Sequence, residues 1–446
     1  MKIAFISANR EKLPDPVIPL GLLYVMASMP ETHEKVLWDL CFQKDPFTYT
    51  SRMLQEYRPD LIAVGMRNIQ NNDYTGTGDN LAYYESIFKT IRSQTLSPVI
   101  LGGSGFSVMP EKLMALLRPD YGISGEGEKS FASLVQHLST GQGSLLEIPA
   151  LYYYNGDTLK SNGRNETFQN LDLVPWPRRL VQAEYYPHGG IEPIQTKRGC
   201  ALHCDYCTYP TIEGRQYRVR DPKLILDEME TVLSENTRIR HFFIVDSVFN
   251  IPRPHAKAIC REMIRRHWKI PWTCYVNPLG FDEEMAELMA QANCAGMEVG
   301  SDSGSDEILE RLRKGFTKKK IENLHRLSQM NGLKDCHTFI LGTPGETWEH
   351  VEETLNFIIE LNPFAAVLMA WISDEALLDP LESQKKKEFR QQLLNALDRA
   401  KHRYPRWVIP PLSVNFNEKL FRWLRGNQLT GPLWQHLDLV SPHVFA

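Results

Sequence analysis

Three cysteines lie within eight consecutive residues, at Cys200, Cys204 and Cys207, in the stretch TKRGCALHCDYCTYP. They follow directly on residues 192–198, which the residue pattern predicts to be a strand. Four thiolates would complete a structural zinc or iron–sulfur site, whereas three leave one metal position open. The C-x3-C-x2-C spacing therefore predicts a metal centre that can bind and orient a further ligand.

A zinc site completed by His203, Cys260 or Cys274 is the alternative. Zinc sites usually pair one C-x2-C unit with a second C-x2-C or H-x3-H cluster, and this sequence has no second cluster. The strand and helix on either side of the loop also weigh against zinc. Cys294 and Cys336 lie in apolar strands, where we expect buried structural thiols.

The first 140 residues alternate short apolar runs with amphipathic helical patterns. This order predicts an α/β fold with a doubly wound, Rossmann-like parallel sheet. The expected strands lie at 2–8, 35–40, 61–66, 98–103 and 120–125.

Ligands of such sheets bind outside the carboxyl ends of the strands. That edge contains GMRNIQNND (65–73), GGSGFS (102–107) and GEGE (125–128), and glycines there allow close approach to the backbone. A dinucleotide site is disfavoured because no G-x-G-x-x-G follows the first strand. The other alternative is that this domain binds nothing.

Residues 141–190 are polar and rich in turn formers, so we expect a linker or a small hairpin. A second alternation over 191–375 predicts six β/α units in a partial barrel, with the active-site groups at the carboxyl ends of the strands. Residues 376–446 read as a small helical domain, and its Trp-rich end either caps the barrel or simply packs against it.

The 446 residues carry a net charge of −4, which does not indicate a nucleic-acid or membrane surface. No apolar run approaches the roughly 18 residues of a membrane span, and the amino terminus reads as a strand. We therefore expect a cytoplasmic protein, where clustered cysteines bind metal more often than they form disulfides.

The cysteine loop resembles that of the radical S-adenosylmethionine (SAM) enzymes, and GMEVGSDSGSDEILERLRKG and FILGTPGET resemble the family's fourth and fifth strand motifs. The resemblance implies a [4Fe–4S] cluster on the three cysteines. Its fourth iron would bind SAM, and an electron from the cluster would cleave SAM to methionine and a 5′-deoxyadenosyl radical.

The same resemblance implies SAM contacts for Tyr206, where the family places an aromatic ring against adenine, and for Asp302 and Gly342 in the two strand motifs. Asp302 stands where the family has glutamate and is one methylene shorter. Asp246 ends the second barrel strand and is either a SAM contact or a helix N-cap. Tyr209 and Glu213, beside the cluster, are candidate substrate contacts.

The first domain resembles the cobalamin-binding module that precedes many radical SAM domains. The resemblance rests on PVIPLGLLYV, MRN, LGGSGFS and YGISGEGE, in both order and position. It implies cobalamin contacts from this set: Arg67, Asn68, Gly102, Gly103, Ser104, Gly125 and Glu126.

The module lacks the D-x-H-x-x-G motif, so no histidine is expected as the lower cobalt ligand. DCHTFI (335–340) begins correctly but lies in the barrel and has Ile340 where the motif has glycine. We expect Arg67 and Asn68 to face the lower side of the corrin instead, where a cation opposes water ligation.

The sequence thus predicts a cobalamin-dependent radical SAM enzyme that methylates an unactivated carbon of a small molecule. In the scheme that the resemblance implies, one SAM methylates cob(I)alamin and a second supplies the radical. A flavodoxin or ferredoxin is the expected electron donor. The alternatives are cobalamin-dependent ring contraction, cyclisation or rearrangement, and a non-catalytic metal-binding protein.

Overall fold

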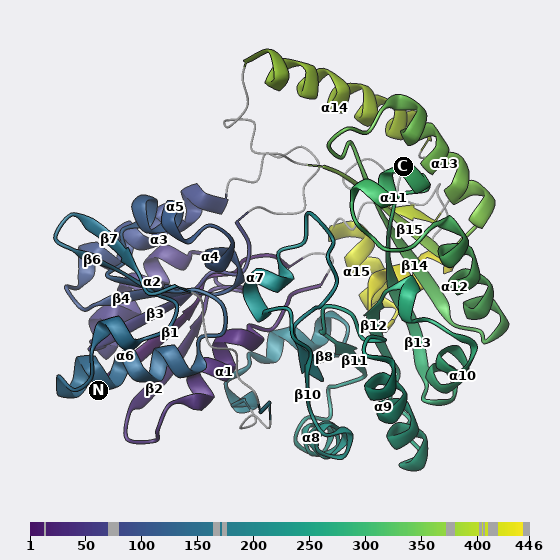
Figure 1. The fold of residues 1–446 in the computed structure, drawn as a ribbon. Coiled ribbons are helices and arrows are strands. Elements are labelled where there is room, and N and C mark those ends of the chain that lie inside the picture. The colour runs from purple at the N-terminus through teal and green to yellow at the C-terminus, as the bar shows by residue number, and fades with distance from the viewer. Residues whose placement is uncertain are drawn as a thin grey trace.

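The computed structural model describes residues 1–12, 15–69, 80–163, 170–171, 176–371, 380–400, 404, 406–408 and 418–439. The described chain forms two seven-stranded sheets, each with its own helices (Figure 1). No helix in these ranges is both long enough and apolar enough to cross a membrane.

The first sheet has the order β2-β1-β3-β4-β5-β6-β7. Its first five strands are parallel, and the last two add an antiparallel hairpin at one edge. The strands are β1 (Lys2–Ser7), β2 (Glu34–Asp39), β3 (Leu61–Gly65), β4 (Val99–Gly102), β5 (Tyr121–Ile123), β6 (Leu151–Asn155) and β7 (Thr158–Ser161).

Both faces of this sheet are buried, as the apolar runs predict. On β1, Ile3 and Phe5 pack into one core with α1 and α6, whereas Ala4 and Ile6 pack into a second core with α2, α3 and α5. The helices are α1 (Leu20–Ser28), α2 (Pro46–Tyr57), α3 (Asn80–Gln94), α4 (Ser104–Val108), α5 (Pro110–Leu117) and α6 (Glu128–Thr140).

The segment expected to be a linker contributes more than a connection. Its hairpin, β6 and β7, extends the first sheet, because LYYYN pairs antiparallel with β5. Tyr152 and Tyr153 on β6 bury their rings on opposite faces of that sheet. The hairpin alternative is therefore confirmed, and the hairpin is part of the first domain.

The second sheet is entirely parallel, in the order β16-β15-β14-β13-β12-β11-β8. Six of its strands are those that the sequence predicts. The strands are β8 (Ile191–Ile194), β11 (His241–Ile244), β12 (Trp272–Val276), β13 (Cys294–Asp302), β14 (Lys334–Leu341), β15 (Ala365–Ala370) and β16 (Trp407–Val408).

One face of this sheet is covered by helices and the other faces the interior of the partial barrel. Along β12, Trp272, Cys274 and Val276 pack into the core with α9 and α10, so the alternating Thr273 and Tyr275 point to the inner face. The helices are α8 (Pro222–Glu235), α9 (Arg253–Arg265), α10 (Glu283–Gln291), α11 (Asp306–Arg311), α12 (Lys318–Met330) and α13 (Trp348–Leu361).

The carboxyl-terminal region is mainly helical, with α14 (Pro380–Ala400), α15 (Glu418–Gly426) and the 3-10 helix η6 (Leu433–Leu439). It is not separate from the barrel. The strand β16 pairs with β15, and Trp434 packs with residues of β14 and β15. The described part of this region therefore completes the barrel sheet and its core.

The two sheets are joined through α7 (Tyr209–Glu213), which lies between them in Figure 1. The helix α7 belongs to the cysteine loop, and it packs against α4 at the carboxyl edge of the first sheet. The predicted ligand edge of the first domain therefore faces the cysteine loop of the second.

Candidate active site

The two ends of the cysteine loop lie side by side in residues 197–198 and 218–219, which we call the neck of the loop. Two short strands, β9 (Lys197–Arg198) and β10 (Arg218–Val219), pair antiparallel and bring the two ends of the loop together. Gly199 begins the loop with φ of +85°, and a Cβ there would lie 2.0 Å from the Gln216 carbonyl oxygen. Only glycine fits this position, because both the backbone conformation and the space exclude a side chain.

The neck is braced by Glu213, one of the predicted substrate contacts. Its carboxylate accepts hydrogen bonds from the Gly199 backbone N–H and from Gln195 Nε2, each at 3.1 Å. Burial raises the pKa of Glu213, although Arg198 opposes the shift. Both carboxylate oxygens hold the loop itself, so its contact with substrate stays a prediction.

The three predicted ligands Cys200, Cys204 and Cys207 are free thiols on this loop, Cys200 buried and the others half-buried. The chain holds the loop by hydrogen bonds from Cys200 N to the Gly214 oxygen and from Asp205 N to the Leu312 oxygen, both at 3.1 Å. The backbone at Cys200 is therefore held by the far end of the same loop, and the Cys204–Cys207 turn is held by Leu312, which follows α11 in the barrel.

The spacing of the sulfur atoms discriminates between metals. Among the described residues, the side chains that bring three potential ligand atoms close enough to share one metal ion are His325, Asp335 and His337, and the three cysteines do not form such a group. Tetrahedral zinc with Zn–S bonds of about 2.3 Å needs sulfurs about 3.8 Å apart. The arrangement fits a multi-iron cluster, in which each thiolate binds its own iron.

The other thiols cannot complete a zinc site. Cys260, Cys274 and Cys294 are buried together in the core between the barrel sheet and its helices. His203 is exposed, and its Nδ1 lies 3.3 Å from Arg215 Nη1. The zinc alternative thus finds no fourth ligand among the residues named for it.

Two predicted SAM residues contact each other. Tyr206, within the loop, donates its hydroxyl proton to Asp302 at the end of β13. Asp302 also forms a buried ion pair with Lys314, whose Nζ lies 2.6 Å from Oδ2. Burial lowers the pKa of Lys314, but the charge and hydrogen bond of Asp302, together with the charges of Cys204 and Cys207, raise it by more. These three side chains fasten the cysteine loop to the barrel and place a cation beside Cys204 and Cys207.

Asp246 joins two neighbouring strands at their carboxyl ends. Its Oδ1 accepts from the backbone N–H groups of Thr196 and Lys197, at 2.8 and 3.2 Å, and its Oδ2 accepts from the Thr196 hydroxyl at 2.5 Å. The N-cap interpretation is wrong, because α9 is preceded by Pro252 and has no side-chain cap. A contact between Asp246 and SAM stays a prediction.

Gly342, the remaining predicted SAM residue, begins the turn after β14 with φ of +81°. Its backbone N–H and that of Thr343 donate to Glu346 Oε2, at 2.5 and 2.9 Å. The other carboxylate oxygen, Oε1, is buried without a hydrogen-bond partner. The turn is thus rigid and carries one unsatisfied acceptor at the carboxyl edge of the barrel.

The predicted cobalamin residues of the first domain occupy its carboxyl edge. Arg67 and Asn68 follow β3, with Arg67 exposed, and Ser104 Oγ donates to the Arg67 carbonyl oxygen at 2.8 Å. Gly102 ends β4. Gly103 has φ of +101°, and a Cβ there would lie 2.4 Å from the Met66 oxygen. The backbone of Met66 therefore occupies the space that a side chain at position 103 would need.

Gly125 and Glu126 lie after β5 and have a second role. Gly125 N donates to Ser107 Oγ at 2.8 Å, whereas the buried Glu126 carboxylate accepts from Arg218 Nη1 at 2.9 Å. Arg198 contacts both acidic residues of the motif, Glu126 and Glu128, and its Nη2 lies 2.6 Å from Glu128 Oε1. The GEGE motif therefore ties the first domain to the neck of the cysteine loop.

Sequence reasoning missed the inner face of the barrel. Tyr275 on β12 and Glu298 on β13 are direct partners in the parallel register. Tyr275 keeps 38% of its surface accessible although it stands on a central strand. The Glu298 carboxylate is the largest cause of the raised pKa of Tyr275, followed by burial, and Arg67 opposes the shift. Tyr275 lies in no motif, and Glu298 lies within GMEVGSDSGSDEILERLRKG at a position to which the sequence analysis assigned no role.

Tyr209, on α7, is the predicted substrate contact that lies nearest to this face. It keeps 36% of its surface accessible. Burial, Glu213 and Cys207 raise the pKa of its hydroxyl, and Arg67 opposes them. Tyr209 also contributes to the raised pKa of Tyr275, so the two tyrosines and Arg67 converge from the cysteine loop, the barrel and the first domain.

An unsatisfied cation also lies beside the loop. Lys197, three residues before Cys200, is 1% exposed, and its ammonium makes no hydrogen bond among the described residues. It stands 5.1 Å from the centre of the Tyr217 ring. A buried cation without a hydrogen-bonded partner is costly, and a cluster bound by three thiolates is an anion that compensates it. The donor set thus fits an iron–sulfur cluster chemically as well as geometrically.

The His325–Asp335–His337 group lies elsewhere. His325 Nδ1 and His337 Nε2 stand 2.6 and 3.0 Å from Asp335 Oδ2, and Ser301 contacts His337 Nδ1 at 2.7 Å. All are buried and join α12, β13 and β14. As predicted, the DCH sequence lies in the barrel, where it forms an internal hydrogen-bond network.

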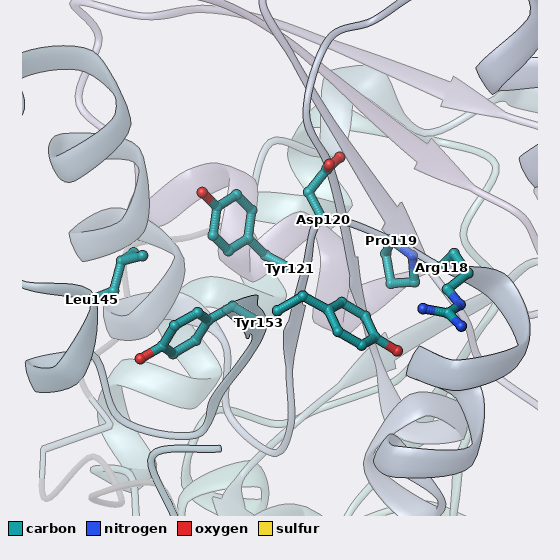
Figure 2. Close-up of a pocket in the computed structure, with 7 residues that line it drawn as sticks. Arg118, Pro119, Asp120, Tyr121, Leu145 and Tyr153 are labelled. Carbon is teal, nitrogen blue, oxygen red and sulfur yellow. The ribbon is translucent and has the colours of Figure 1, made fainter. Parts of the chain in front are cut away.

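A surface pocket of about 350 Å³ is lined by Arg118, Pro119, Asp120, Tyr121, Leu145, Tyr153 and Tyr154 (Figure 2). Tyr121 begins β5, so this pocket lies at the amino edge of the first sheet, opposite to the Gly102–Ser104 edge. It is therefore remote from the cysteines.

Residues 194–358 match the model of the Radical SAM superfamily, a range that spans the cysteine loop and strands β11–β14. The chain is a radical SAM enzyme, as the cysteine spacing predicts. Its overall fold is that of cobalamin-dependent members of this class, with a Rossmann-like sheet ahead of the barrel.

The relatives span both domains. The chain is 27% identical over 419 aligned residues to a tryptophan 2-C-methyltransferase from Streptomyces laurentii, covering 79% of this chain and 70% of the relative. It superposes on the methyltransferase TsrM from Kitasatospora setae, solved with tryptophan and a SAM analogue, with a TM-score of 0.83 at 24% identity, covering 98% and 97% of the two chains.

A second solved relative is OxsB, a cobalamin-dependent radical SAM enzyme solved with aqua-cobalamin and SAM. The TM-score is 0.70 at 18% identity, and the match covers 96% of this chain and 62% of OxsB. TsrM has also been solved with cobalamin and a [4Fe–4S] cluster. The three cofactors predicted from the sequence are thus those present in solved proteins of this fold.

Proposed function

We propose that the protein is a cobalamin-dependent radical SAM methyltransferase that acts on a carbon atom of a small molecule. The observation that carries the proposal is the placement of the free thiols Cys200, Cys204 and Cys207 on a loop that faces the ligand edge of the first domain. Similarity along nearly the whole chain to methyltransferases that use these cofactors supports it.

In this proposal the three cysteines hold the cluster, and the edge formed by Arg67, Gly102 and Ser104 holds cobalamin. When bound, these groups and SAM supply one-electron chemistry and a transferable methyl group. The chain's own residues orient them. The Tyr206–Asp302–Lys314 group fixes the loop against the barrel, and the Glu126–Arg218 pair fixes it against the first domain.

The inner face of the barrel, with Tyr209 and Tyr275, is where we place the substrate. Both rings are accessible, and both lie close to Arg67 of the first domain. A substrate there would be held between the predicted SAM residues and the predicted cobalamin edge. The eight cysteines are unpaired, which suits the reducing cytoplasm, where flavodoxin or ferredoxin would supply electrons.

The test uses anaerobically purified protein reconstituted with iron, sulfide and cobalamin. It is incubated with SAM that carries a labelled methyl group, with and without L-tryptophan as the first probe substrate. Methyl transfer predicts label in the corrin fraction or in the small-molecule product. Production of 5′-deoxyadenosine with no label in either fraction would instead support the non-methylating alternative, ring contraction, cyclisation or rearrangement.

A further inference from the structure

Glu298 is a carboxylate on the inner face of the barrel, and no cation of the described residues forms an ion pair with it. Its neighbours on β13, Met297 and Val299, pack into the helix-covered core, so Glu298 points to the opposite face. Among the ion pairs of the described residues, none includes Glu298. Among the described residues its hydrogen-bond partner is Trp434, whose Nε1 donates to Oε1 at 2.9 Å.

The other carboxylate oxygen remains available. Glu298 is half-buried, and its Oε2 has no hydrogen-bond donor among the described residues. Glu298 itself is partly accessible, and its register partner Tyr275 is 38% exposed on the same face, so we infer that this oxygen faces accessible space. A charge-assisted hydrogen bond from a cationic donor would strongly stabilise a half-buried carboxylate whose second oxygen has no donor.

Nearby charges do not satisfy Glu298. Asp15 is close enough for Glu298 to raise its pKa, after the larger effect of burial. The cation next to Asp15 is Arg425, and its Nη2 is paired with Asp15 Oδ1 at 2.5 Å. Arg67 lowers the pKa of Tyr275, but it is not among the causes of the pKa shift of Glu298. Glu298 and Asp15 are therefore two neighbouring carboxylates, and the guanidinium beside them, that of Arg425, is already paired with Asp15.

Aromatic rings border the same carboxylate. Tyr275 stands beside Glu298 across the strand pair, and Phe243 meets Tyr275 edge to face at 5.1 Å. Trp434 closes the amino-terminal end of this face, where it packs with residues of β14 and β15. Ring faces next to a carboxylate favour a protonated amine, which gains both an ion pair and a cation–π contact.

We propose that Glu298 anchors a protonated amine of the substrate, so that the enzyme acts on amine-bearing molecules with an apolar or aromatic body. This inference rests on the proposed function for the identity of the site, and it adds the class of substrate. Glu298 binds and orients the substrate, and no role in the chemical step is assigned to it.

The test compares matched amines and acids by anaerobic calorimetry on the reconstituted enzyme at pH 8. The probes are tryptamine and 2-phenylethylamine, against indole-3-propionate and 3-phenylpropionate. We expect both amines to bind at least tenfold more tightly than their matched acids. In Glu298→Gln the amine affinity should fall about tenfold or more and the acid affinity should not fall.

Glu235→Gln, an exposed carboxylate at the end of α8, is the matched control and should bind like the wild type. Thermal unfolding of each variant verifies that it is folded. The inference is overturned if the wild type shows no amine preference at millimolar probe, including binding of neither class, or if the preference survives in Glu298→Gln.

Iron, sulfide and corrin are measured in the same samples, which separates this inference from the proposed function. Protein that holds all three and lacks amine preference overturns the amine anchor alone. Protein that prefers amines through Glu298 but retains no cluster and no corrin supports the anchor and contradicts the proposed methyltransferase.

Discussion

Arg218 of the cysteine-loop neck donates to Glu126 of the first domain, with Nη1 2.9 Å from Oε2 and both side chains almost fully buried. Arg198, two residues before Cys200, reaches the same carboxylate at 3.4 Å. The relative position of the two predicted cofactor sites is therefore set by a shared acidic residue. Glu126 was predicted from sequence as a cobalamin contact, and its side chain instead faces these arginines.

Glu126→Gln should lower the free energy of unfolding by about 3 kcal/mol, because it leaves two buried guanidinium groups without their full counter-charge. Chemical denaturation checks this value. Glu147→Gln, an exposed carboxylate of the same domain, is the control and should change stability by no more than about 0.5 kcal/mol. Equal effects of the two substitutions would show that the contact does not stabilise the protein.

Gly199→Ala should impair cluster assembly in a folded protein. The added Cβ would meet the Gln216 oxygen at 2.0 Å, in addition to the strain of a positive φ. Gly141→Ala is a close match, since Gly141 has φ of +70° but nothing within 4 Å of the added atom. We expect iron bound per chain to fall several-fold in Gly199→Ala only. Normal iron content in that variant would contradict the assigned loop geometry.

Stability should depend on pH through Glu298. Burial raises the pKa of Glu298 from 4.5 to about 7, and the hydrogen bond from Trp434 opposes the shift. Between these values the folded protein holds a proton that the unfolded chain has lost, so the unfolding free energy falls as pH rises. Glu298→Gln should remove this dependence.

The Glu298→Gln variant should therefore gain stability relative to the wild type, by up to about 3 kcal/mol between pH 4.5 and 7. Urea denaturation at several pH values measures the difference. A difference that stays constant across this window would show that Glu298 titrates normally and is better solvated than its position indicates.

Arg67 is predicted to face the lower side of bound cobalamin. It is exposed at the carboxyl edge of the first sheet and follows Met66, which packs against Gly103. Arg67→Ala should then admit water to the cobalt and change the absorption spectrum of the bound corrin. The matched substitution Arg52→Ala, on the exposed surface of α2, should leave that spectrum unchanged. An unaltered spectrum in Arg67→Ala would remove the assignment.

The sequence predicts the parts of this molecule that are encoded locally. Cysteine spacing identifies the cluster loop, and apolar alternation identifies eleven strands in two sheets. A hairpin was one of two alternatives predicted for residues 141–190, beside a linker, and its docking onto β5 depends on Tyr152 and Tyr153 packing into opposite cores, which no local pattern shows.

Long-range pairs escape such reasoning for a physical reason. Glu126 and Arg218 are 92 residues apart, and nothing in the sequence around either residue indicates that they pair. The same holds for Glu298 and Trp434, 136 residues apart, which meet only once the carboxyl-terminal segment packs against the barrel. Asp302 was predicted from its motif, but its ion pair with Lys314 appears only in the folded loop.

Electron paramagnetic resonance of the reduced, reconstituted protein, recorded with and without SAM, tests the open iron position most directly. We predict about four iron and four sulfide per chain. We further predict a spectrum that changes on addition of SAM and is lost in Cys204→Ala. Zinc in place of iron, or a four-iron spectrum that SAM leaves unchanged, would contradict an enzyme built around three cysteines and one vacant coordination position.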